Sequence, residues 1–153
     1  MKRWIAISVA GVLAATMAVG ASAASPEREE MRAQKEAFRT NQTELKEQSA
    51  ANQALRTEWK AARQAARDEG ELTREIKEKL AQLAGQIEAQ RQALEGTREE
   101  IIAAKALAQS QKKAGDLSAA SQAWEEAVAV QQQRIDVKSE IGVLLEERLA
   151  LLP

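Results

Sequence analysis

Residues 76–108 read IKEKLAQLAGQIEAQRQALEGTREEIIAAKALA and carry apolar residues at steps of three and four or their sums. An α-helix brings positions with this spacing onto one face, because 3.6 residues complete a turn. Gln90, Thr97 and Gln111 fill the remaining positions of the stripe, so the heptad pattern lasts for about five repeats and favours a coiled coil. The apolar members of the stripe are Ile76, Leu80, Leu83, Ile87, Leu94, Ile101, Ala104 and Ala108.

The composition excludes several kinds of chemistry. The chain of 153 residues has no Cys and no His, which removes disulfides, thiol nucleophiles, thiolate and imidazole metal ligands and the usual general base. The 22 basic and 23 acidic residues nearly balance, and this balance gives no reason to expect a nucleic-acid partner. Most acidic residues stand near a Lys or Arg, as on solvated helix faces. We therefore expect no enzyme, with no catalytic residue, cofactor or metal.

Residues 1–23 have the pattern of a secretory signal peptide. Lys2 and Arg3 precede an apolar run from residue 5 to residue 19, and Ala21-Ser22-Ala23 forms an A-x-A cleavage site. The alternative is an uncleaved membrane anchor, but the run is rich in Ala and Gly and barely reaches the roughly 20 residues that a membrane span needs. We expect cleavage after Ala23, which would leave 24–153 as a single helical coiled-coil domain in the periplasm or outside the cell.

The first helix is expected at about residues 26–69. Ser25 and Pro26 suit the N-cap and first helical positions, and Gly70 suits the end. Seam residues recur every seven places, and Asn52 is one of them. A buried Asn in a seam disfavours wrong registers, so Asn52 is the candidate register residue; the alternative is a surface Asn on a bent helix. The seam comprises Met31, Phe38, Leu45, Asn52, Trp59 and Ala66.

Two further helices are expected at about 74–114 and 118–152. Thr73 can cap the second helix, and Gly115 can end it. Gly85 and Gly96 lie inside this range and are interpreted as tolerated defects in one continuous helix; the alternative is that they permit close helix approach or bending. The turn at 115–118 resembles the helical hairpin of a tetratricopeptide repeat over about one 34-residue unit, and we interpret this as convergent packing. The matching residues are Leu107, Ala108, Gly115, Asp116, Ala120, Trp124 and Ala127.

Equal helix lengths and short turns predict an all-α, long antiparallel three-helix bundle. Folding at Gly70 and Gly115 places Leu55, Ile87 and Leu145 in one layer of the core. A second layer would contain Phe38, Ala104, Ala108 and Trp124. The alternative architecture is a hairpin of the first two helices that dimerises, with the third helix packed across it.

A signal peptide followed by a Cys-free helical domain rich in Gln, Glu and Arg resembles the periplasmic stress proteins of the Spy and CpxP type. Leu72-Thr73 begins the L-T-x-x-Q motif of that family, but Ile76 stands where Gln is expected. The chain is also similar to secreted bacterial coiled-coil proteins of uncharacterised function. These resemblances imply either a protein-interaction or structural module of the cell envelope, or an ATP-independent chaperone or stress-response regulator.

The two ends of the bundle differ in apolar content, which gives the candidate interaction residues. Leucines dominate the end near Gly70, whereas the other end pairs Gln34, Asn41 and Gln48 with Thr97, Ala104, Gln111 and Gln131. We expect poorer burial there, and local opening that exposes residues to a protein partner, an unfolded client or a second copy of the chain; the alternative is a frayed terminus without function. The candidates are Met31, Phe38, Ile101, Ile102 and Trp124.

Overall fold

The computed structural model describes residues 25–153, which form four helices and no strand. These are α1 (Pro26–Asp68), α2 (Arg74–Gln92), α3 (Thr97–Ala114) and α4 (Leu117–Ala150). The predicted all-α fold is confirmed. The expected signal peptide, residues 1–23, lies outside the described residues. None of the helices in the described part of the chain combines the length and the hydropathy that a membrane span requires.

The helix ends follow the capping residues found in the sequence. Ser25 occupies the N-cap position of α1 without a capping hydrogen bond from its side chain, and Pro26 is the first helical residue. Gly70 has a φ of +75°, and the N–H groups of Gly70 and Glu71 donate to the carbonyls of Arg67 and Ala66, the pair of bonds that closes a helix on a left-handed glycine. Thr73 then caps α2, since its hydroxyl accepts a hydrogen bond from the Ile76 N–H at 3.2 Å.

The prediction of one continuous helix over 74–114 is wrong. Gly96 has a φ of +77°, a conformation that costs other residues free energy, and it separates α2 from α3. Leu94 and Glu95 form turn hydrogen bonds to carbonyls three residues earlier. The Thr97 hydroxyl donates to the Leu94 carbonyl and accepts from Arg134 of α4, so the break is stabilised by polar contacts. Gly85, by contrast, lies within α2 as expected.

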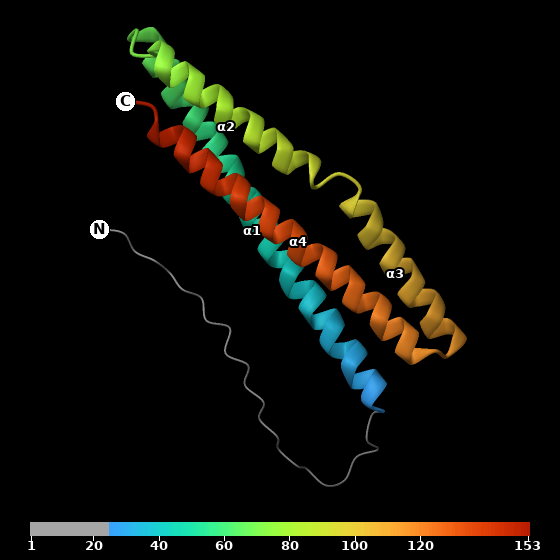
Figure 1. Cartoon of the computed structure of the whole chain (residues 1–153). Coiled ribbons are helices and arrows are strands. Elements are labelled where there is room, and N and C mark those ends of the chain that lie inside the picture. Colours follow the sequence, from blue (N-terminus) through green and yellow to red (C-terminus); the bar gives the residue numbers. More distant parts are fainter. Residues whose placement is uncertain (1–24) are drawn as a thin grey trace.

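Helix α4 is the centre of the molecule (Figure 1). It lies parallel to α1 and antiparallel to α2 and α3, and its backbone closely approaches all three. Among residues 25–153, the backbone of α1 makes no such approach to α2 or α3. The alternative architecture, built on a hairpin of the first two predicted helices, is therefore wrong. The stripe from which the fold was inferred packs against α4 instead.

Both predicted core layers form. One contains Ile87, Ile141 and Leu145, with half-buried Leu55 packed against them. The other contains Phe38, Ala104 and Ala127, with Trp124 packed beside them. Ala108, which was predicted in the second layer, is buried without belonging to that cluster.

The end opposite Gly70 has well-buried core residues of its own. Ala108, Ala120 and Ala127 are 0% exposed there, and Met31 and Phe38 are also buried. Small side chains allow the backbones of α3 and α4 to come close together. The expectation that this end opens more easily stays a prediction, which hydrogen exchange can test.

Polar seam residues of α1 serve as donors to α4. Asn52 is 4% exposed, and its amide donates to the Lys138 carbonyl at 2.8 Å. Gln48 donates to the Asn52 Oδ1 at 3.2 Å and to the same Lys138 carbonyl at 3.4 Å. Asn41 donates to the Val128 carbonyl at 3.4 Å. The placement of Asn52 in the seam is thus confirmed, and its bonds join α1 to α4 at a defined register.

Candidate functional site: a cationic cleft between α1, α2 and α4

The five candidate interaction residues do not form one accessible surface. Phe38 and Trp124 meet edge to face with ring centroids 5.4 Å apart, and Ile101 packs against the same cluster. Met31 is buried on α1, whereas Ile102 is 58% exposed on α3. The three clustered residues are therefore core residues in this structure.

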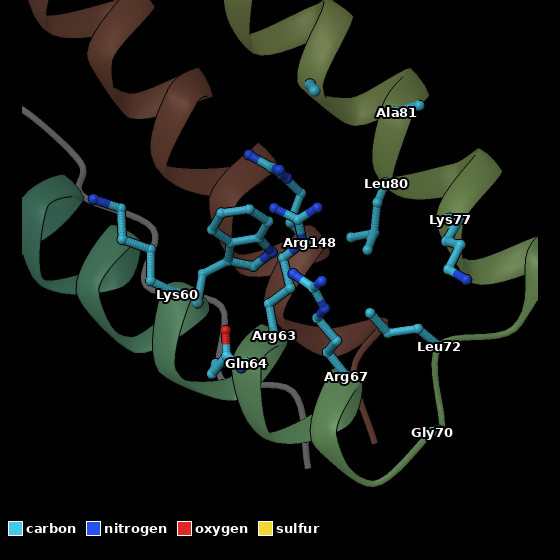
Figure 2. Close-up of a pocket in the computed structure, with 12 residues that line it drawn as sticks. Lys60, Arg63, Gln64, Arg67, Gly70, Leu72, Lys77, Leu80, Ala81 and Arg148 are labelled. Atoms are coloured by element: carbon cyan, nitrogen blue, oxygen red, sulfur yellow. The ribbon is translucent and has the colours of Figure 1, made fainter.

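A different feature is open to solvent. A cleft of about 860 Å³ lies between α1, α2 and α4, next to the turn at Gly70 (Figure 2). It falls within the roughly 300–1,000 Å³ range of ligand pockets in proteins. Its lining residues are Trp59, Lys60, Arg63, Gln64, Arg67, Gly70, Leu72, Lys77, Leu80, Ala81, Ala84 and Arg148. We call it the cationic cleft.

The lining includes five basic residues and no acidic one. Figure 2 shows Arg63, Arg67 and Arg148 in the middle of the cleft, with Leu72 and Leu80 on its α2 side. Within residues 25–153, the three ion pairs are Arg74 with Glu78, Lys79 with Glu75 and Arg91 with Glu88, all inside α2. No carboxylate of the described residues thus forms an ion pair with the three arginines.

Trp59 holds two of these arginines near its ring. The Cζ of Arg148 lies 3.8 Å from the ring centroid, and that of Arg63 lies 5.2 Å from a Trp59 ring centroid. Both distances fall within the range of cation–π attraction. The Trp59 Nε1 and the Arg148 Nε are buried, and neither has a hydrogen-bond partner within the described residues. These two N–H groups lie beneath the cleft surface, which is formed instead by the exposed side chains of Arg63 and Arg67 and by half-buried Arg148.

The surroundings of the cleft are also cationic. Burial lowers the pKa of Arg148 below its ordinary value, and the charges of Arg63 and Arg91 lower it further. Burial likewise lowers the pKa of Arg56, with a further contribution from the charge of Arg91. These shifts have the direction expected when like charges gather in partly buried positions. An anion bound here would offset that repulsion.

The opposite wall of the cleft is apolar except for Lys77. Leu80 is buried, Leu72 and Ala84 are half-buried, and Ala81 is exposed at the rim. Donors thus face a short apolar surface across the cleft. Such an arrangement suits binding of a ligand with both negative charge and apolar area.

Known proteins give no further guide to the site. No family model, curated protein or solved structure matches this chain. Its function has to be inferred from the residues themselves.

Sequence reasoning missed the cleft for a physical reason. Trp59 and Arg148 are separated by 89 positions, and only the parallel packing of α1 on α4 brings them together. A local signal was nevertheless present. Lys60, Arg63 and Arg67 lie on one face of α1, and like charges at this spacing destabilise a helix.

Proposed function

We propose that the protein is an exported, non-catalytic protein-interaction module of the cell envelope or extracellular space, and that the cationic cleft is its contact site. The observation that carries this proposal is the group of Arg63, Arg67 and Arg148 in the cleft, none of which forms an ion pair with a carboxylate of residues 25–153. Clustered cations cost stability in a free protein. A partner that supplies negative charge would offset that cost.

The distribution of exposed apolar residues supports a specific module over a general chaperone. A chaperone that shields unfolded clients needs a broad apolar surface. The large apolar residues exposed in residues 25–153 are Ile102, Leu107 and Val143, and none of them lines the cationic cleft. The interaction module is therefore the proposed function, and the chaperone is kept only as the alternative.

Site-specific photocrosslinking in the producing cell tests the proposal. A photoreactive amino acid at position 81, on the rim of the cleft, should yield a discrete crosslinked protein species. The matched control is position 106, which is also an exposed alanine of a helix but lies on α3. Equal crosslinking at both positions, or a continuous smear of products at position 81, would contradict a specific module; the smear would favour the chaperone.

A further inference from the structure

We propose that the cationic cleft binds a short, extended, acidic segment of a partner protein in which at least two carboxylates flank one apolar side chain. This proposal rests on the function proposed above and names the chemistry that the partner must carry.

The donors in the cleft define the acidic part of the ligand. Arg148 lines the cleft without an ion pair to any carboxylate of residues 25–153, so a bound carboxylate would meet a cation with no competing partner. A guanidinium can bind a carboxylate through two parallel hydrogen bonds. Because Arg63 and Arg67 add two more guanidinium groups from α1, a single carboxylate would leave most of the positive charge unpaired.

The α2 wall defines the apolar part. Leu72, Leu80 and Ala84 face the cleft from α2 and the turn before it. The segment from Lys77 to Ala84 extends for about 10 Å at 1.5 Å per residue. This length accommodates one apolar side chain of a peptide. An acyl chain of a membrane lipid extends through about 15 Å, half of the hydrocarbon core, so the wall suits a peptide better than a lipid.

The size of the cleft favours an extended segment. Its volume of about 860 Å³ is suited to a short peptide, and an extended chain is narrower than a helix, which is about 10 Å across with its side chains.

Fluorescence anisotropy with a defined probe tests this assignment. The probe is a fluorescein-labelled peptide of sequence Gly-Glu-Glu-Leu-Glu-Glu-Gly, titrated with the purified protein. Arg148→Gln should weaken binding by about tenfold, because it removes one charge-assisted contact. Arg98→Gln is the matched control, since it removes the same charge from an exposed position on α3, and it should leave the affinity within about twofold. Thermal unfolding verifies that each variant is folded; if Arg148→Gln does not fold, exposed Arg67→Gln carries the test instead.

Altered probes separate the ligand classes. A peptide with Gln in place of every Glu, and one with Gly in place of Leu, should each bind at least tenfold more weakly than the original. Equal binding of either altered peptide would overturn the proposal. So would stronger binding of laurate or of phosphatidylglycerol vesicles than of the peptide, or equal loss in the Arg98→Gln control.

The two proposals can fail separately. Without peptide binding, but with a specific crosslink from position 81, the acidic-segment assignment would be wrong and the interaction module would stand. Peptide binding without any crosslinked protein in the cell would support the chemistry of the cleft and contradict the proposed function.

Discussion

Gly142 of α4 shows how closely α1 and α4 are fitted at the Asn52 register. A Cβ added at Gly142 would lie 2.9 Å from the Asn52 Oδ1 and 3.0 Å from the Gln48 Nε2. Both side chains are already engaged with the Lys138 carbonyl. The absence of a side chain at position 142 therefore allows the polar contact between the helices.

We expect Gly142→Ala to lower the free energy of unfolding by about 1 kcal/mol. The gain in helix propensity, about 1 kcal/mol, is outweighed by overpacking, which costs about 1 to 3 kcal/mol. In an Asn52→Ala background the nearest clash disappears, so Gly142→Ala should become neutral or stabilising there. Urea denaturation of the four proteins in this cycle measures the difference.

Gly85→Ala is the matched control, because a Cβ at Gly85 would meet no atom within 4 Å. It should stabilise the protein by up to about 1 kcal/mol in both backgrounds. If Gly142→Ala changed the free energy of unfolding equally with and without Asn52, the two positions would not be energetically coupled.

Lys138 gives a prediction for pH dependence. Burial lowers its pKa below the ordinary 10.5, and the charges of Arg134 and Arg56 lower it further. The charged form of Lys138 is therefore disfavoured in the folded state, which lowers the free energy of unfolding. This loss of stability is fully present below the folded pKa, and it disappears as the pH rises from the folded pKa towards 10.5. Lys138→Met should raise the melting temperature at pH 7 by about 1 to 3 °C.

The advantage of Lys138→Met over the unmodified protein should shrink as the pH is raised from 7 to 10, as measured by thermal unfolding at each pH. Lys46→Met is the control, since Lys46 is exposed on α1 and does not line the cationic cleft; it should not reproduce the gain in melting temperature at pH 7. A constant advantage across that pH range would mean that the substitution acts through packing alone.

At the scale of the elements, α2 and α3 differ in how firmly they are held. The backbone of α3 approaches that of α4 more extensively than α2 does, and the cationic cleft opens between α2 and α1. Fewer close contacts lower the free energy of local opening. Amides in the middle of α2 should therefore exchange with deuterium faster than those in the middle of α3.

Native-state hydrogen exchange followed by mass spectrometry measures this difference. This predicted order of exchange rates is opposite to the one that leucine content suggested. From leucine content, the end near Gly70, which includes α2, was expected to be the more stable end. Protection of α2 equal to or greater than that of α3 would restore the earlier expectation. Addition of the acidic peptide should slow exchange in α2 if the cleft closes on it.

The stripe of residues 76–111 shows what the sequence can predict about an element. Every predicted stripe position is buried or half-buried, yet the helix is interrupted at Gly96. Periodicity could not reveal the break, because Leu94 before it and Thr97 after it both face the core. The helix ends at Gly70 and Gly115 were predictable, since there the glycine coincided with the end of a stripe.

For the molecule as a whole, the sequence predicted the layers but not which helix lies at the centre. Heptad spacing indicates which face of a helix is buried, but it does not indicate which other helix packs against that face. The cationic cleft depends on that choice of partner, because its residues come from α1, α2 and α4. The functional site was therefore less predictable than the core.

Export is a prediction about the whole chain. If residues 1–23 are removed, the intact mass of the exported protein should match a chain that begins at Ala24. Mass spectrometry of the periplasmic and culture fractions makes the measurement, and Ala23→Leu should block cleavage by placing a large residue at the A-x-A site. A full-length protein retained in the membrane of cells that produce the unmodified chain would contradict cleavage.

The central position of α4 has a consequence for the order in which the protein can fold. Of the four helices in residues 25–153, α4 follows the other three along the chain, and it supplies the surface on which they pack. Before α4 has been synthesised, α1 has no close helical neighbour among these residues. Forming the α1–α4 contacts must then close a loop that contains α2 and α3. The segment from α1 to α3 would thus remain without its tertiary core until α4 had emerged from the ribosome, a state suited to passage through a membrane channel.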